Sequence, residues 1–336
     1  MRLNLLASVS LALVGYSSAV DNWSNIVGGK PVAQNGLPFM AHLIIENKPE
    51  CGGALIGDKW VITAAHCLVK SVTSIELGDQ LLNIPSSQVQ VILGTIQSNS
   101  TSPYTVARYS LAPDFDYLEY RSDLAILELT APVQISDSIR PIGISQQPIK
   151  EKQVVTAAGW GATETQNFSD TLYEVNLEVG TEAKCTTVVP QYQGLNGPKI
   201  CVANRPGSDT CFGDSGGPLF QQENGHFSIL GVTSYGPQKD VTALFKCGGN
   251  DTYGVYTRLV SFNDFIKNVT GLSEEQMKPG YYSASSSGTG AESTKNSEKN
   301  NTTSNSTSDS TSIYSNNLVT AFVLSSISYL SLSSMN

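Results

Sequence analysis

Short apolar runs rich in β-branched residues recur from residue 26 to about residue 260, with Gly, Pro, Asn and Ser between them. They include FMAHLII, WVITAA, VQVILGTI, LAILEL, VVTAAGW, FSILGVTSY and GVYTRLV. Runs of this length bounded by turn residues predict strands, and several in succession predict a β-sandwich or a pair of β-barrels. Strands and helices do not alternate along this stretch. The pattern therefore predicts an all-β fold.

The segment LVSFNDFIKNVTGL, which follows the last of these runs, has a different period. Its apolar residues Phe262, Phe265, Ile266 and Val269 are spaced i, i+3, i+4 and i+7, which places them on one face of a helix. We therefore predict a short helix that closes the globular part, and we bound that part at residues 26–272.

The N-terminus has the pattern of a secretory signal peptide. Arg2 precedes an apolar run over residues 3–14, and small residues follow at positions 17–19. The run is too short for a membrane-spanning helix. We expect a signal peptide over residues 1–19, cleaved after Ala19, and therefore a secreted protein.

Beyond Gly280 the composition changes to Ser, Thr, Asn and Gly with few apolar residues. Such a segment buries too little apolar surface to offset its ordering entropy, so we expect a disordered, glycosylated stalk over residues 273–317. N-glycosylation sequons begin at Asn99, Asn167, Asn250, Asn268, Asn300, Asn301 and Asn305.

Residues 318–336 form a moderately apolar tail with no Lys or Arg after Lys299. Small residues lie about ten positions upstream, which is the arrangement of a GPI-attachment signal. A spanning helix needs a longer and purer apolar run. We expect a GPI signal that retains the protein at the outer cell surface, with a spanning helix and an ordinary tail as the alternatives.

Composition and cysteine count narrow the class of protein. Of the 336 residues, 40% are hydrophobic and 15% charged, which is typical of a globular chain. The net charge of -9 disfavours a nucleic-acid binder. Six cysteines in a secreted chain predict three disulfides, and their count leaves fifteen pairings open. No C-x-x-C pair supports a zinc site.

The stretch SDTCFGDSGGP contains G-x-S-x-G around Ser215, a pattern that often marks a nucleophilic serine. A serine hydroxyl needs a base, usually histidine, and the chain has only His42, His66 and His226. The α/β-hydrolase plan requires the histidine after the serine. Only His226 follows, eleven residues on, in what looks like a turn entering a strand. We therefore disfavour that plan and expect His42 and His226 to be ordinary structural or surface histidines.

The alternative order places His66 first, in WVITAAHCLV, then Asp123 at the start of an apolar strand, then Ser215. This is the order of chymotrypsin, whose roles are the general template for such triads. Further motifs occur in sequence order: IVGG, CGGALI, TAAHC, SDLAILEL, AGWG, DTCFGDSGGP, SYG and GVYTRL. Over residues 26–269 the chain resembles a trypsin-like serine protease of the chymotrypsin family.

The resemblance implies two six-stranded antiparallel β-barrels with the active site between them. It also implies three disulfide pairs, Cys51 with Cys67, Cys185 with Cys201, and Cys211 with Cys247. The expected activity is hydrolysis of peptide bonds through an acyl-enzyme, without a cofactor or metal. The segment after Asp79, read as a loop, lacks the carboxylates of a calcium site.

The roles implied by the resemblance can be placed residue by residue. Ser215 would attack the scissile carbonyl, His66 would accept and return the proton, and Asp123 would orient His66. The backbone N–H groups of Gly213 and Ser215 would form the oxyanion hole.

The resemblance also implies a pocket for a basic side chain. Asp209, six residues before Ser215, would lie at its base and favour Lys or Arg in protein and peptide substrates. Gly236 and Gly254 would keep the pocket open. The stretch Ser234-Tyr235-Gly236 would hydrogen-bond an extended substrate.

Activation would follow cleavage before Ile26, which makes residues 20–25 a short propeptide. The new α-ammonium would pair with Asp214 and order the oxyanion loop. Asn25 precedes the cut, and a trypsin-like enzyme should not cut after Asn, so we expect a separate activating protease.

Three features depart from the family pattern. Tyr235 stands where the family usually has Trp, Phe212 replaces a commoner polar residue, and residues 237–253 form a longer segment than in simple trypsins. A protease with shifted specificity is therefore one alternative. A non-enzymatic homologue that serves as a binding module on a glycosylated stalk is another.

Overall fold

The computed structural model describes residues 26–74, 78–100, 102–162, 168–203, 207–237, 247–249 and 252–284. The expected signal peptide, propeptide and tail lie outside the described residues, as does the expected stalk beyond residue 284. Five glycosylation candidates also lie outside them, namely Asn167, Asn250, Asn300, Asn301 and Asn305. None of the helices in the described ranges is long and apolar enough to cross a membrane.

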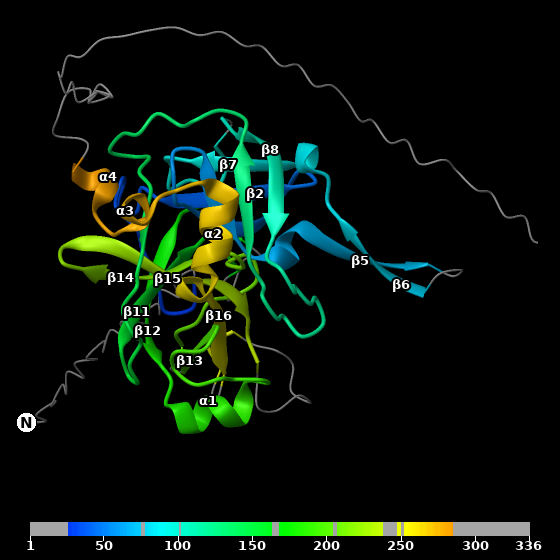
Figure 1. Ribbon diagram of the computed structural model, residues 1–336, viewed down its shortest axis with the longest axis vertical. Helices are drawn as coiled ribbons and strands as arrows, with labels where there is room; N and C mark the ends of the chain where they lie inside the picture. Colours follow the sequence, from blue (N-terminus) through cyan, green and yellow to red (C-terminus); the bar gives the residue numbers. More distant parts are fainter. Residues whose placement is uncertain are drawn as a thin grey trace, which may run out of the picture. The chain divides into compact units, whose positions relative to one another are not determined.

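Six antiparallel strands close into a first barrel in the order β2-β3-β4-β9-β8-β7. Strands β2, β7 and β8 of this barrel are labelled in Figure 1. Their bounds are β2 Met40–Ile45, β3 Lys48–Leu55, β4 Trp60–Thr63, β7 Val89–Leu93, β8 Tyr104–Leu111 and β9 Ala125–Leu129. Four of the apolar runs in the sequence supply β2, β4, β7 and β9. Side chains such as Leu43, Val61 and Leu127 are fully buried in one core cluster.

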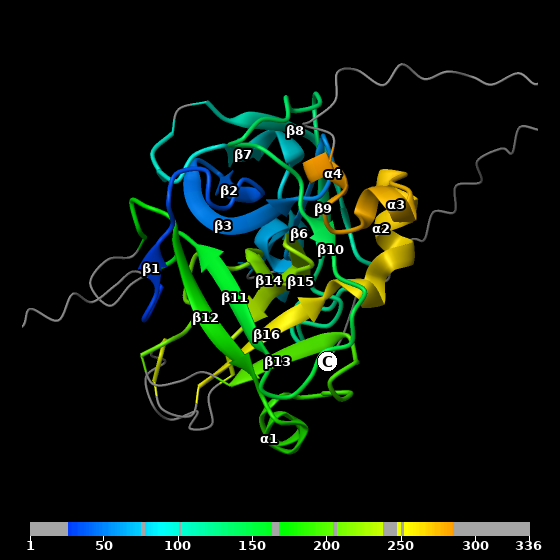
Figure 2. The ribbon, with the colours of Figure 1, turned by 90° about the vertical axis from the view of Figure 1, so that its left-hand side faces the viewer.

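The second barrel follows the order β12-β11-β14-β15-β16-β13, and the pairing of β12 with β13 closes it. Its strands are β11 Val154–Gly159, β12 Tyr173–Val179, β13 Lys199–Ala203, β14 Pro218–Glu223, β15 His226–Tyr235 and β16 Tyr253–Arg258. Outside it, β1 (Lys30–Pro31) pairs with β12 and β10 (Gly143–Ile144) pairs with β15 (Figure 2). The prediction of two six-stranded antiparallel barrels is confirmed.

Short helices connect and close the barrels. They are η1 Ala65–Leu68, η2 Ser86–Gln88, α1 Glu182–Val188, η3 Leu259–Phe262 and α2 Asn263–Thr270. The predicted C-terminal helix is α2. Its Ile266 is buried, and Phe265 and Val269 pack against the same core cluster. Gly271, with φ 69°, ends the helix in the left-handed conformation that glycine adopts without strain.

The chain remains folded after the boundary expected at residue 272. Helix α3 (Glu274–Met277) begins with a capping box formed by Ser273 and Gln276, and α4 (Tyr281–Ala284) follows it. Met277 and Tyr282 are buried. Residues 273–284 therefore belong to the folded part rather than to the expected stalk, because the side chains of Met277 and Tyr282 are buried against it.

A separate two-stranded hairpin lies between β4 and β7 in the sequence and projects from the first barrel in Figure 1. It consists of β5 (Val69–Ser74) and β6 (Gly78–Asn83), with Lys70 opposite Leu82. The start of the segment after Asp79, which the sequence suggests is a loop, is thus a strand. Its pairing partner β5 likewise lacks a strong apolar pattern, with Val69 buried and Ser71 and Val72 exposed.

His42 makes the stability of the fold depend on pH. Its ring is buried on β2 and stacks on Trp160 at a centroid distance of 4.8 Å. Within the described ranges its Nδ1 has no hydrogen-bond partner. Burial lowers the pKa of His42 from 6.5 to about 4. The unfolded chain therefore binds a proton at higher pH than the folded chain does.

From this pKa we predict that the free energy of unfolding falls by about 3 kcal/mol as pH drops from 6.5 to 4. The stabilisation is fully present above the unfolded pKa and is lost toward the folded pKa. His42→Phe should flatten this part of the profile in urea unfolding. The exposed His226 provides the control His226→Gln, which should keep the slope. An unchanged slope in His42→Phe would contradict the prediction.

Candidate active site

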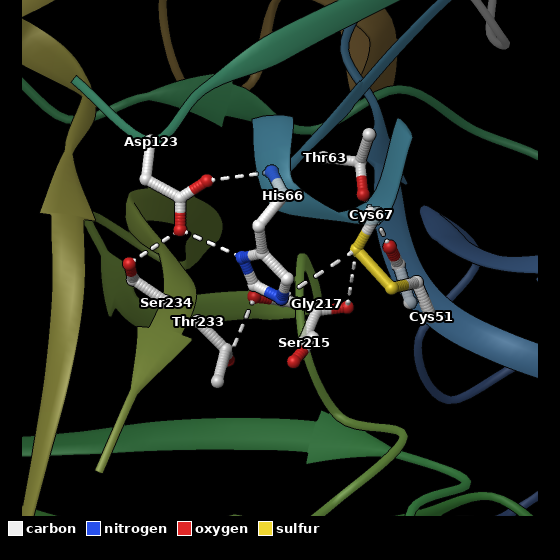
Figure 3. The surroundings of a disulfide bond; sticks show 10 residues. Cys51, Thr63, His66, Cys67, Asp123, Ser215, Gly217, Thr233 and Ser234 are labelled. Atoms are coloured by element: carbon white, nitrogen blue, oxygen red, sulfur yellow. Dashed lines mark hydrogen bonds and ion pairs between the residues drawn. A yellow bond between two sulfur atoms is a disulfide. The ribbon is translucent and has the colours of Figure 1, made fainter. Parts of the chain in front are cut away.

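His66 is held in the short helix η1, directly after β4. The neighbouring Cys67 forms a disulfide with Cys51 on β3, so a covalent bond ties this helix to the barrel (Figure 3). The other two disulfides join Cys185 to Cys201 and Cys211 to Cys247. All three pairs are those that the family resemblance implies.

Asp123 is completely buried just before β9 and faces His66 (Figure 3). Its Oδ2 lies 2.8 Å from His66 Nδ1, and its Oδ1 accepts the His66 backbone N–H at 2.9 Å. Ser234 Oγ donates to the same Oδ2 at 2.5 Å. Burial would raise the pKa of Asp123, but the charge of His66 and these hydrogen bonds outweigh it and hold the pKa below its usual value. Asp123 is therefore an ionised acceptor that fixes the imidazole.

Ser215 lies in the turn before β14, where backbone hydrogen bonds tie this turn to both barrels. Its carbonyl accepts from Gly52 N–H of β3 at 2.8 Å, and Gly216 N–H donates to Thr233 O of β15 at 2.8 Å. Ser215 and His66 line the same cavity, which has a volume of about 390 Å³. Within the described ranges no hydrogen bond joins Ser215 Oγ to His66 Nε2. Such contacts often tighten only when substrate binds.

Gly213, two residues before Ser215, has φ 92°, which favours glycine. A Cβ at this position would lie 2.6 Å from Phe168 Cε1, so a side chain would collide with that ring. Conformation and space both require glycine here. The tight turn that contains Ser215 therefore depends on a glycine at position 213.

Asp214 is completely buried, although its neighbours Gly213 and Ser215 are partly exposed. Oδ1 accepts from Gly161 N–H and Oδ2 from Cys211 N–H, each at 2.8 Å. Burial raises the pKa of Asp214 to about 7, against the effect of these two N–H groups. The side chain of Ile26 is also fully buried. A cation beside Asp214 would relieve the cost of burying this carboxylate.

Asp209 is buried at the wall of the same cavity, 3% exposed, with Thr210 and Gly236 beside it. Its Oδ2 accepts from Gly248 N–H at 2.9 Å, next to the Cys211–Cys247 disulfide. Ser234 and Tyr235 also line the cavity. Gly254 does not line it. It lies on β16, where a Cβ would come within 3.0 Å of the Tyr256 ring.

Two residues near the site were not singled out in the sequence. Tyr120 lies three residues before Asp123, lines the cavity, and meets the His66 ring edge-on at a centroid distance of 5.4 Å. Lys199, at the start of β13, is buried behind Tyr235. The only signal for Tyr120 is its nearness to Asp123 in the chain. Phe212, which departs from the family pattern, is 66% exposed at the cavity rim.

Within the described ranges, one group of side chains is spaced like metal ligands, namely Cys51, Cys67 and His66. The two cysteine sulfurs form a disulfide and are not thiolates. This group therefore offers no metal donor set.

A family model described as Trypsin matches residues 26–266. The chain is 31% identical to mannan-binding lectin serine protease 1 of Mus musculus over 260 residues, which are 74% of this chain but only 36% of that protein. It is 30% identical to kallikrein-8 of Homo sapiens over 77% of this chain and 91% of that protein. It is 33% identical to phenoloxidase-activating factor 3 of Holotrichia diomphalia, over 72% and 71% respectively.

Proposed function

Because the chain belongs to the trypsin family of serine endopeptidases, we propose that it hydrolyses peptide bonds after Lys or Arg in protein substrates. The observation that carries this proposal is the buried carboxylate of Asp209 in the cavity that His66 and Ser215 also line. A cation beside a buried carboxylate offsets part of the cost of its desolvation, so a guanidinium or ammonium group is a natural occupant of this cavity.

In the proposed reaction, Ser215 Oγ attacks the scissile carbonyl carbon while His66 Nε2 accepts the hydroxyl proton. The carbonyl π electrons move to oxygen, and the Gly213 and Ser215 N–H groups stabilise the resulting oxyanion. Collapse of this intermediate breaks the C–N bond, and His66 gives its proton to the leaving amine. Water then attacks the acyl ester with His66 as base, which releases the acid and restores Ser215.

Asp123 supports this cycle through its contacts with His66. A buried carboxylate 2.8 Å from Nδ1 keeps a proton on that nitrogen, so Nε2 is free to accept one. It also stabilises the imidazolium that forms when Nε2 is protonated. Ser234 Oγ donates a further hydrogen bond to the same carboxylate oxygen.

We further propose that cleavage before Ile26 activates the protein. The new α-ammonium would place a cation beside buried Asp214, and their pairing would order the turn that contains Gly213. Support comes from the full burial of both Ile26 and Asp214. Asn25 at the cut points to a separate activating protease.

Activation can be tested with a full chain in which residues 21–25 are replaced by the recognition sequence of a chosen protease. Cutting should raise kcat/KM on an arginine peptide on the order of 100-fold, as a minor competent state becomes the main one. Activity of the cut form should then fall at high pH. The ammonium has a reference pKa of about 8, pairing raises it, and the active state is lost as pH rises through this raised value. An uncut chain that is equally active would contradict the proposal.

The three disulfides fit the proposed secretion into an oxidising compartment. Asn99 and Asn268 are exposed and open to the proposed glycosylation. We propose that the stalk beyond residue 284 and the hydrophobic tail retain the enzyme at the cell surface through a GPI anchor. Release of the protein from cells by a phosphatidylinositol-specific phospholipase would test this, and unchanged retention would contradict it.

A further inference from the structure

Lys199 is a cation buried next to the cavity, with only 8% of its surface exposed. Its Nζ donates to the backbone oxygen of Glu119 at 3.4 Å and to the hydroxyl of Tyr235 at 3.3 Å. Within the described ranges no carboxylate lies within ion-pair distance of it. Burial lowers the pKa of Lys199, whereas the charges of Glu119 and Asp123 act in the opposite direction. A buried ammonium held by neutral oxygens is costly, so its contacts suggest a specific role.

The first of these contacts holds the loop between β8 and β9. Tyr120 has φ 48°, a left-handed conformation that is uncommon for a residue with a bulky side chain. The Glu119 carbonyl, which Lys199 holds, belongs to the peptide directly before Tyr120. The ammonium thus fixes the peptide where the chain enters this unfavourable conformation. That conformation sets the Tyr120 ring edge-on to His66, at an interplanar angle of 72°.

The second contact is with Tyr235, at the end of β15. Lys199 Nζ lies 5.2 Å from the centre of the Tyr235 ring, within range of a cation–π interaction, and also binds its hydroxyl. The Tyr120 and Tyr235 rings lie 5.1 Å apart, and both line the cavity that contains Ser215. Lys199 itself does not line it. One buried cation therefore positions two rings that come from segments far apart in the sequence.

We propose that Lys199 is a positioning residue whose ammonium holds the Tyr120 and Tyr235 rings together as an aromatic wall, so that loss of this cation weakens binding of substrates with an aromatic or apolar residue shortly before the cleaved Lys or Arg. The inference rests on the proposed function, in which residues 234–236 bind the extended substrate segment before the scissile bond. Side chains of that segment would meet the Tyr235 and Tyr120 rings.

The chemistry of the wall favours apolar over basic side chains. Aromatic pairs gain from offset or edge-to-face contact beyond the area that they bury. A basic substrate side chain would instead approach the charge of Lys199, which already interacts with the Tyr235 ring. The enzyme would thus recognise a basic substrate side chain at Asp209 and an apolar substrate side chain at the aromatic wall.

The test uses the full chain cut before Ile26 and two chromogenic peptides, acetyl-Phe-Phe-Arg and acetyl-Gly-Gly-Arg 4-nitroanilide. The wild type should favour the Phe peptide. Lys199→Met keeps an unbranched apolar stem but removes the ammonium. It should lower the ratio of the two kcat/KM values about tenfold, mainly through KM of the Phe peptide. Lys199→Arg restores the cation and should recover most of the ratio.

A merely structural role of Lys199 would lower kcat/KM of both peptides equally, and an unchanged ratio overturns the proposal. Tyr235→Phe provides a second variant that keeps the ring but removes the hydroxyl, and its ratio should fall by less. A wild type that does not favour the Phe peptide overturns the proposal even if no variant folds. Absence of turnover on both peptides would instead contradict the proposed function itself.

Discussion

Replacing Ser215 by alanine in the cut protein is expected to lower kcat on an arginine peptide by about 10⁶-fold. The substitution removes the Oγ that we assign as the nucleophile. Of the residues between Cys211 and Ser215 that line the described cavity, Ser215 is the one with a hydroxyl group. The turn itself should persist, because the Ser215 carbonyl bond to Gly52 involves only the backbone. Burst and steady-state kinetics on the chromogenic peptide would measure the loss.

His66→Ala should cost a similar factor, and the double variant should cost no more than either single one, because the two residues act as a unit. The exposed Ser71 of β5 provides a matched control, and Ser71→Ala should retain full activity. Thermal unfolding of each variant would show that the fold is kept. A Ser215→Ala protein within tenfold of the wild type would contradict the assignment of Ser215.

Asp209→Asn is expected to lower kcat/KM on an arginine peptide by about 10³-fold, which is the scale of removing one partner of a buried, hydrogen-bonded charge pair. Asparagine has nearly the same shape and can still accept the Gly248 N–H, so the cavity should keep its form. Turnover of a phenylalanine peptide should not fall, because no charge pair is lost with that substrate. The ratio of the two kcat/KM values is the quantity to measure.

Asp264 on α2 is an exposed acid outside the cavity and provides the matched control. Asp264→Asn changes the net charge by the same amount and should leave the ratio unaltered. If both variants changed the ratio equally, long-range charge rather than contact with Asp209 would be responsible. If neither changed it, the role of Asp209 in cation recognition would be wrong.

Much of the site could be placed from the sequence because its residues lie in short local motifs. His66 is next to a disulfide cysteine, Asp123 lies just before an apolar strand, and Ser215 comes two residues after a glycine that the turn requires. The barrels were foreseen for a similar reason, since strands such as β2 and β9 are continuous apolar runs. These signals are local, so no knowledge of distant contacts is needed to read them.

The features that escaped prediction depend on contacts between distant segments. Lys199 and Glu119 are 80 residues apart, and the sequence around Lys199 indicates only the start of a strand. Helices α3 and α4 each bury a single large side chain, Met277 and Tyr282, within a polar stretch that suggests disorder.

We propose that this family member cuts protein chains after Lys or Arg by means of Ser215. The most direct test digests a mixture of unfolded proteins with the full chain cut before Ile26 and identifies the new peptide ends by mass spectrometry. We expect Lys or Arg to precede nearly every new end, and we expect these ends to be absent with Ser215→Ala. New ends mainly after aromatic residues, or no ends beyond those of the variant, would contradict this proposal.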